Sequence, residues 1–193
     1  MPVVTIDHVF PGRQAILSDN VDGLEALVHY AYAKGHRRIA FIHGERTAVT
    51  ESRLESFYNT CAQLQITVPE AYVREGVYHD PERCAQMTSD LLALDCPPTC
   101  ILLPDDFSAV GGLGAIAEAG LSVPEDISVA GYDGVTLSQV MKPQLTTYRQ
   151  DTLALGREAA RRLVALIEQP GAAQVDCAIV RGALLPGGTV RPI

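Results

Sequence analysis

Short apolar runs alternate with amphipathic segments along most of the chain. The runs 39–42, 100–103 and 127–130 are continuously apolar or nearly so, a pattern typical of buried strands. Between them, apolar residues recur every three or four positions, which indicates helices with one buried face. Helices are predicted at 20–33, 52–64, from Asp80 to about 94, at 107–119 and at 152–168, and further extended segments at 3–7, 72–77, 145–148 and 177–180.

The order of these elements predicts the fold class. Between residues 20 and 131 helices and strands alternate strictly, and helical crossovers between apolar strands imply parallel pairing. The sequence therefore predicts an α/β fold with a doubly wound parallel sheet. The segment 3–7 and the helix 152–168 lie outside this run and indicate a second unit that the chain leaves and later re-enters.

Residues typical of helix ends support these boundaries. Gly35 follows the first helix, and Asp80-Pro81 provides an N-cap and a first helical residue for the third. Asp106 is expected to cap helix 107–119 rather than to contact a ligand, and Asp151 to cap helix 152–168. The glycine-rich stretch 110–114 lacks the spacing of a nucleotide-binding loop, so we interpret it as close helix packing.

Composition narrows the classes of partner. The 193 residues are 47% hydrophobic and include 15 Lys and Arg against 23 Asp and Glu, a formal net charge of −8. An acidic chain is a poor candidate for binding nucleic acid phosphates by itself. No apolar run is long enough to span a membrane, and the first ten residues lack the pattern of a signal peptide. We expect a cytoplasmic protein without a membrane partner.

The five cysteines do not indicate a disulfide framework. They are odd in number and scattered, and Cys96 and Cys100 have a C-x3-C spacing with no nearby His. We expect reduced, mostly buried cysteines, no metal site and no cofactor.

Candidate ligand-binding residues follow the predicted strands. In open parallel sheets ligands bind outside the carboxyl ends of the strands. Arg53 and Tyr78 follow two strands, and Asp105 and Asp133 follow two more. Carboxylates and a guanidinium bind hydroxyl or amino groups, and an aromatic ring covers an apolar face. This mixture suits a small molecule with several hydroxyl or amino groups.

Each candidate also has a structural interpretation. Arg53 could be a surface helix residue paired with Glu51 or Glu55, Tyr78 could pack at a strand end, and Asp133 could belong to a turn with Gly134. An α/β enzyme that uses the carboxylates at 105, 106 and 133 for acid–base chemistry is an alternative. No nucleophile, metal or cofactor motif supports it, and His36 and His43 lack a nucleophile partner motif.

Four segments resemble LacI/GalR transcriptional regulators. Segment 120–133 (GLSVPEDISVAGYD) matches the pattern G-L-x-V-P-x-D-(I/V)-S-V-x-G-(F/Y)-D almost position for position. Segment 35–42 resembles the strand entry G-H-x-x-I-A, and Pro98-Thr99 with Asp105-Asp106 resembles P-T-A-x followed by (N/D)-D. Segment 143–151 resembles P-x-L-T-T-(V/I)-x-Q. The resemblance covers essentially the whole chain in the right order.

The resemblance implies a periplasmic-binding-protein-like, effector-binding core, with two α/β lobes and a small, sugar-like effector between them. Residues 20–148 match the C-terminal lobe. Residues 1–19 and 149–180 match pieces of the N-terminal lobe, and 181–193 would be a C-terminal tail. By the family pattern the effector-binding positions are Asp7, Arg53, Tyr78, Asp105, Asp133 and Gln150.

The resemblance also implies a repressor of transcription, not an enzyme, that forms a homodimer through 107–119 and 135–142. The family's DNA-binding helix-turn-helix and most of its N-terminal lobe precede the first residue here, so DNA would be bound only through a segment absent from this chain. The remaining N-lobe pieces should then expose apolar surface. Ser56 replaces a usual Gly, and Asp105 stands where several sugar regulators have Asn, which makes the cleft more acidic. A solute-binding protein of a transport system, with the same fold, is the alternative.

Overall fold

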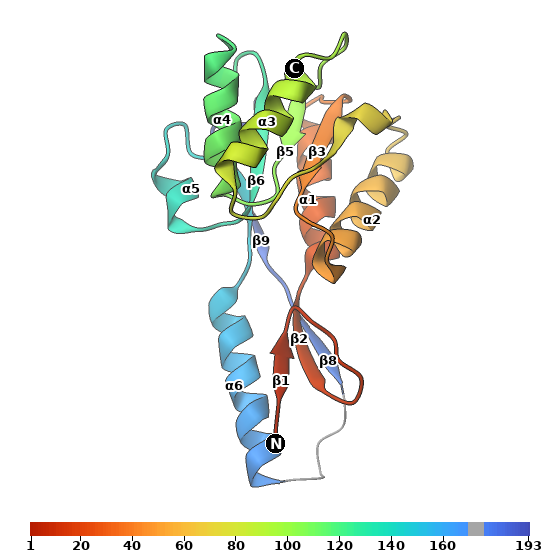
Figure 1. Ribbon diagram of the computed structural model, residues 1–193, viewed down its shortest axis with the longest axis vertical. Coiled ribbons are helices and arrows are strands. Elements are labelled where there is room, and N and C mark those ends of the chain that lie inside the picture. The colour runs from red at the N-terminus through yellow and green to blue at the C-terminus, as the bar shows by residue number, and fades with distance from the viewer. Residues whose placement is uncertain (170–175) are drawn as a thin grey trace.

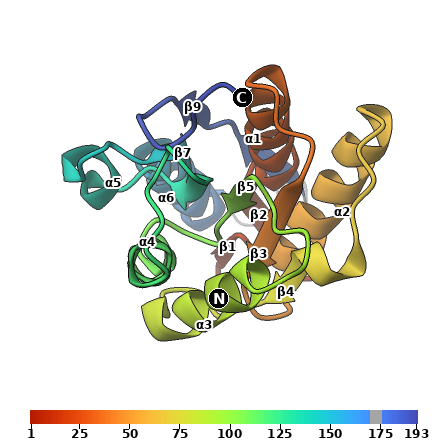
Figure 2. The same cartoon turned by 90° about the horizontal axis from the view of Figure 1, so that it is seen from above.

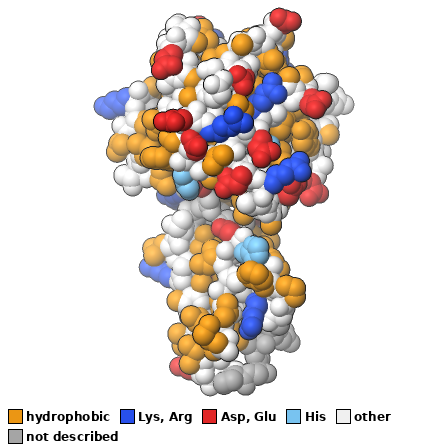
Figure 3. Space-filling model, viewed as in Figure 1, with side chains coloured by type: hydrophobic (Ala, Val, Ile, Leu, Met, Phe, Trp, Pro, Cys, Tyr) orange, Lys and Arg blue, Asp and Glu red, His pale blue; other side chains and the backbone are white. Residues whose placement is uncertain are grey.

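The molecule has a larger and a smaller unit joined by a narrow crossing region (Figure 1). The computed structural model describes residues 1–169 and 176–193. Each unit is built around its own sheet, and the chain passes between them where β2 (Gln14–Ser18) leads into α1 (Asn20–Ala33) and β7 (Thr146–Arg149) leads into α6 (Thr152–Glu168). A third passage runs from β8 (Cys177–Val180) to β9 (Ala183–Leu185). The waist between the units is also visible on the surface (Figure 3).

The larger unit contains a six-stranded sheet with the order β4-β3-β5-β6-β7-β9. All neighbouring strands are parallel except β9, which pairs antiparallel with β7. The predicted doubly wound parallel sheet is confirmed. Its other strands are β3 (Ile39–His43), β4 (Val73–Glu75), β5 (Cys100–Leu102) and β6 (Ser128–Asp133).

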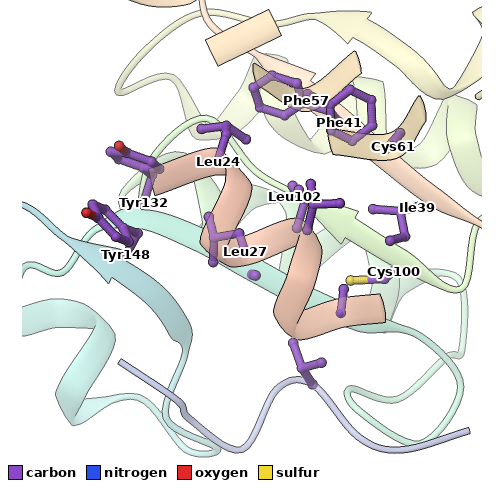
Figure 4. Packing of buried hydrophobic residues seen from close by; sticks show 14 of the residues in the cluster. Leu24, Leu27, Ile39, Phe41, Phe57, Cys61, Cys100, Leu102, Tyr132 and Tyr148 are labelled. Atoms are coloured by element: carbon purple, nitrogen blue, oxygen red, sulfur yellow. The ribbon is translucent and has the colours of Figure 1, made fainter. Parts of the chain in front are cut away.

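Helices cover both faces of this sheet. Figure 2 shows α1 and α2 (Ala48–Gln63) on one side of the strands and α3 (Pro81–Leu92) and α4 (Ser108–Glu118) on the other. Each side has its own buried apolar cluster. In the first, the rings of Phe41 and Phe57 lie 5.3 Å apart, and those of Tyr132 and Tyr148 5.4 Å apart (Figure 4). Burial on both faces explains why the strands read as continuous apolar runs.

Local signals determine most helix ends. The carboxylates of Asp80 and Asp151 accept hydrogen bonds from the backbone N–H groups of Arg83 and Ala154, as predicted. Helix α2 begins earlier than the predicted residue 52, because Thr47 accepts from the N–H of Thr50 and starts the helix at Ala48.

The glycines of α4 permit the close helix contact that the sequence predicted. A side chain at Gly111 would lie 1.8 Å from the carbonyl oxygen of Pro81 at the start of α3. A Cβ at Gly112 would lie 3.1 Å from Thr88 Oγ1 of α3. The glycine-rich stretch therefore serves packing between α3 and α4.

The smaller unit is a three-stranded parallel sheet with the order β1-β2-β8, where β1 is Val4–Ile6. Helix α6 packs along β1 and β2. Of the described residues in α6, only Leu155 is fully buried. Apolar side chains gather on the surface of this unit (Figure 3). Those exposed there are Ile6, Val9, Phe10, Leu153, Leu163, Val164, Ile167 and Ile179.

Among the described residues, four short elements were not predicted: β2, β9, α5 (Thr136–Val140) and the 3-10 helix η1 (Glu70–Tyr72). Residues 181–193 were expected to form a C-terminal tail. They contain β9, which pairs with β7 of the larger sheet, and the buried Val190. The N–H of Ile193 donates to the carbonyl of Lys34 at 2.9 Å. This last stretch is therefore packed against the larger unit.

The cysteines are free, as expected. Cys61, Cys84 and Cys100 are buried, and burial raises the pKa of each thiol to about 12. Cys96 and Cys177 are exposed, one in each unit. Within the described ranges, the helices are too short or too polar to cross a membrane.

Candidate functional site

The carboxyl ends of the larger sheet's strands face the crossing region. The residues that follow β3, β5, β6 and β7 supply the polar side chains of this edge, and α2 adds Arg53. The smaller unit adds the residues that follow β1 and β2. This is the place where parallel sheets bind ligands.

Arg53 points inward instead of lying on the surface of α2. Its residue is 4% exposed, its Nε donates to Asn20 Oδ1 at 2.9 Å, and its Nη1 donates to the carbonyl of Pro104 at 3.0 Å. The guanidinium carbon lies 3.6 Å from the centroid of the Tyr132 ring, a cation–π contact. The structure therefore rejects the interpretation of Arg53 as a surface residue.

Tyr78 packs beside this group. Its ring centroid lies 5.6 Å from the guanidinium carbon of Arg53, and its hydroxyl lies 3.0 Å from Thr50 Oγ1. A Cβ at Gly44 would lie 2.2 Å from the ring, so the absence of a side chain there admits the tyrosine. Tyr78 therefore lies between the loop after β3 and the start of α2.

The capping of α4 differs from the prediction. Asp105, not Asp106, accepts a hydrogen bond from the Ser108 N–H, at 2.7 Å. Its second oxygen accepts from the backbone N–H of His79 at 2.9 Å. The prediction that Asp106 caps this helix is wrong, because the Asp106 N–H is bonded to the Tyr132 carbonyl and its side chain turns toward β6 and β7.

Asp106 instead fixes the loop after β6. Its oxygens accept from Thr147 Oγ1 at 2.6 Å and from the Val135 N–H at 2.9 Å. The residue is 0% exposed, and burial raises its pKa to about 6, although these hydrogen bonds oppose the rise. A Cβ at Gly131 would lie 2.5 Å from Asp106 Oδ1, so the strand must have glycine there.

Asp133 ends β6 in a backbone conformation that is rare for non-glycine residues, with φ 101°. Gln150 Nε2 donates to Asp133 Oδ1 at 2.6 Å. Burial raises the pKa of Asp133, and the nearby Arg53 guanidinium opposes the rise. Arg53 and Gln150 therefore stabilise the charged form of this carboxylate.

Asp7 lies at the end of a strand in the smaller unit, as Asp133 does in the larger unit. It follows β1 with φ 52°, and its Oδ1 accepts from the Ser18 N–H at 2.6 Å. The Ser18 hydroxyl lies 2.8 Å from Asp7 Oδ2 and 2.6 Å from Gln150 Oε1. Polar contacts thus run from Asp7 through Ser18 and Gln150 to Asp133 across the crossing region.

A cavity of about 360 Å³ lies beside Asp7 and Ser18, which both line it. Its lining comes from both units and is mostly apolar. Of the predicted site residues only Asp7 lines it, while the other five lie toward the sheet edge. Lining residues that the sequence did not suggest are Ser18, Asn20, Ala48, Val49 and Ser52.

The missed residues had little local signal. Ser18 ends β2, which was not predicted, although the Pro11-Gly12 turn followed by an apolar run in 15–17 is typical of a strand. Asn20 starts α1 and would be recognised as a partner of Arg53 only from the fold.

Comparisons with known proteins identify the family. The model of the periplasmic binding protein-like domain family matches residues 28–190. The chain belongs to this family. Within the periplasmic binding protein-like domains its relatives are LacI-type repressors, which confirms the predicted resemblance.

Two relatives illustrate the similarity. The chain is 34% identical over 173 residues to the probable HTH-type transcriptional repressor ExuR of Bacillus subtilis, covering 88% of this chain and 52% of ExuR. It is 31% identical over 195 residues to the HTH-type transcriptional repressor CytR of Escherichia coli, covering 95% of this chain and 56% of CytR. The chain thus spans about half the length of these relatives, which are described as repressors and not as enzymes.

Solved structures agree. A LacI transcriptional regulator from Bacillus cereus subsp. cytotoxis superposes with a TM-score of 0.92 at 28% identity, covering 100% of this chain and 69% of that one. A LacI family regulator from Enterococcus faecium with bound ribose gives 0.89 at 25% identity, covering 100% and 72%. The lac repressor dimer bound to operator and the anti-inducer ONPF gives 0.87 at 30% identity, covering 98% and 57%.

Proposed function

We propose that this chain is the effector-binding region of a LacI-type transcriptional repressor and that its effector is a small, sugar-like molecule. The observation that carries the proposal is the meeting of two strand-end carboxylates, Asp7 and Asp133, from different units at one polar crossing region. A ligand held by both would favour one relative position of the units.

In this proposal the effector lies between residues 20–148 on one side and residues 1–19 and 149–180 on the other. Asp7 and Asp133 accept hydrogen bonds from its hydroxyl groups. Gln150 holds the carboxylate of Asp133 in place, the nearby Arg53 guanidinium stabilises its charge, and Tyr78 covers an apolar face of the ligand. Asp105 orders the loop around His79 at the rim. The ribose bound to the Enterococcus faecium regulator supports this ligand class.

The complete regulator would act as a cytoplasmic homodimer. Exposed apolar side chains at Phe107 just before α4, at Val110 on α4, and at Val135 and Val140 around α5 support an interface in 107–119 and 135–142. DNA would be contacted through a helix-turn-helix outside these residues. Effector binding would then bias the distance between the paired DNA-binding segments.

A calorimetric titration tests the effector proposal. The chain is titrated with D-ribose, D-galactose, D-glucuronate, adenosine and hypoxanthine. We expect at least one compound with several hydroxyl groups to bind, and Asp133→Asn to lower its affinity about tenfold or more without lowering the unfolding temperature. Asp95→Asn, at an exposed position in the larger unit, is the matched control. Binding of none of the compounds, or unchanged affinity in Asp133→Asn, would contradict the proposal.

A further inference from the structure

The hydroxyl of Ser18 stands between the two units at the end of β2. Its oxygen is within hydrogen-bond distance of two acceptors, Asp7 Oδ2 at 2.8 Å and Gln150 Oε1 at 2.6 Å. Ser18 is almost fully buried and lines the cavity at the crossing region together with Asp7. It is therefore placed to interact both with a ligand and with the connection between the units.

A count of protons shows that these contacts are not all satisfied at once. The Ser18 hydroxyl carries one proton and can donate to one acceptor only. The orientation of the Gln150 amide is set by Asp133, because Nε2 must face that carboxylate and Oε1 then faces Ser18. If the Gln150 amide were rotated by 180°, its Oε1 would face Asp133 Oδ1 at 2.6 Å, and the hydrogen bond to Asp133 would be lost. One of the two Ser18 contacts is thus always an oxygen pair without a proton between.

Without a ligand at Asp7 Oδ2, the surroundings of Ser18 favour donation of its proton to Asp7 rather than to Gln150. Asp7 already accepts the Ser18 N–H at Oδ1, and a charged carboxylate is a stronger acceptor than an amide oxygen. The Ser18 proton then points to Asp7, and the contact with Gln150 is left without a bond.

We propose that Ser18 is a positioning residue of the effector site, which transmits occupation of Asp7 to Gln150 and so to the connection between the units. This rests on the proposed function, in which Asp7 takes a hydroxyl of the effector. An effector hydroxyl that donates to Asp7 Oδ2 competes with Ser18 for that oxygen, and in this proposal the Ser18 proton then turns to Gln150 Oε1. The smaller unit is then hydrogen-bonded through Gln150 to Asp133 of the larger unit. A ligand with a donor at this place draws the units together, and one that presents only acceptors does not.

Two native cysteines provide a measurement without ligand. Cys96 in the larger unit and Cys177 in the smaller are exposed, while the other three are buried, so spin labels attach selectively to this pair. Without ligand the Ser18 proton points to Asp7, so we expect Ser18→Ala alone to leave the distances between the labels unchanged.

Asp7→Asn places an amide that donates to the Ser18 oxygen, so the Ser18 proton is freed for Gln150 as it is when an effector hydroxyl competes for Asp7. This variant should narrow the distribution of distances and shift the side-chain amide signals of Gln150 in nitrogen-15 spectra. Adding Ser18→Ala to Asp7→Asn should remove both effects, whereas adding Ser18→Thr, which keeps the hydroxyl, should preserve them. Adding Ser89→Ala, at an exposed position of α3 outside the cavity, is the control.

The same variants are then titrated with D-ribose and with any compound that binds the unaltered chain. Ser18→Ala should lower the affinity about tenfold and abolish the narrowing of the label distances that ligand produces. If Asp7→Asn changes neither the ligand-free distances nor the Gln150 signals, or changes them equally with and without Ser18→Ala, the role of Ser18 is refuted. If no compound binds the unaltered chain, the proposed function fails, while the ligand-free measurements still decide whether Ser18 links the units.

Discussion

The two units of the molecule use similar segments in very different ways. Both are parallel sheets with apolar strands, but the larger sheet has helices on both faces and the smaller sheet is backed by α6. Ile101 of β5 is 0% exposed, whereas Ile179 of β8 is 62% exposed. Apolar area stabilises only when it is removed from water, at about 25 cal/mol for each Å². The same residue type therefore contributes strongly in one unit and little in the other.

This difference bears on the proposed site, because the two walls of the crossing region have different rigidity. The larger wall is anchored by Arg53, Asp105 and Asp106, whose side chains are buried and hydrogen-bonded. The smaller wall depends on the contacts of Asp7 and Ser18. A unit with little buried apolar surface opens at low free energy. Ligand-dependent movement is thus expected in the smaller unit.

The strongest test of the contrast substitutes the same residue type in both sheets. Ile101→Ala should lower the free energy of unfolding by about 2–5 kcal/mol, because it leaves a cavity in a packed core. Ile179→Ala should change it by less than about 0.5 kcal/mol, as for exposed positions. Urea denaturation measures both values. Equal losses would mean that the face around Ile179 is buried in solution.

A second test concerns the buried carboxyl of Asp106 in the larger unit. Its pKa in the folded chain is about 6, above the 3.8 of an unperturbed aspartate, so the folded state binds more protons between these pH values. This group's contribution to stability therefore falls as the pH rises from about 4 to 6. Asp106→Asn should remove this dependence, a difference of about 2–3 kcal/mol across the window.

Thermal unfolding measured from pH 4 to 7 compares Asp106→Asn with the unaltered chain. Other carboxylates are the same in both proteins, so the difference between the two profiles isolates Asp106. Parallel profiles would show that this carboxyl titrates normally and that its burial is compensated.

The smallest expected effect concerns the interface between two copies of the chain, which could lie in either unit. Val110 on α4 and Val164 on α6 are similarly exposed. In the proposed dimer, Val110→Lys should raise the dissociation constant of the dimer about tenfold, because it places a charge in an apolar interface. Val164→Lys should leave it unchanged. Sedimentation velocity measures both, and dissociation by Val164→Lys alone would move the interface to the smaller unit.

The sequence predicted elements whose signals are local. Helices α1 and α6 have the predicted boundaries, because periodicity and capping residues agree at 20–33 and 152–168. The elements missed, β2, η1, α5 and β9, are three to five residues long. Their residues pair with segments far away, as β9 does with β7, and a short segment has no periodicity of its own.

The sequence indicated which side chains lie near one another at the strand ends, but not their contacts. The strand-end rule brought Arg53 and Asp133 to one edge, yet their burial depends on Asn20, Tyr132 and Gln150. Asp105 and Asp106 are adjacent acids in front of one helix. Which of them caps it depends on a backbone bond to Tyr132 and a side-chain bond to Thr147. Such distant partners cannot be read from neighbouring residues.

The left-handed backbone at Asp7 and Asp133 limits how a site of this kind can be re-engineered. Aspartate, asparagine and glycine accept positive φ most readily, so a larger side chain at either position would cost backbone energy before it touched any ligand. Libraries that randomise these two positions would consist mostly of strained variants. Diversity aimed at new ligands is better placed at Val49 and Ser52, which line the cavity from ordinary backbone conformations. The two aspartates thus form a fixed frame within which neighbouring positions can vary.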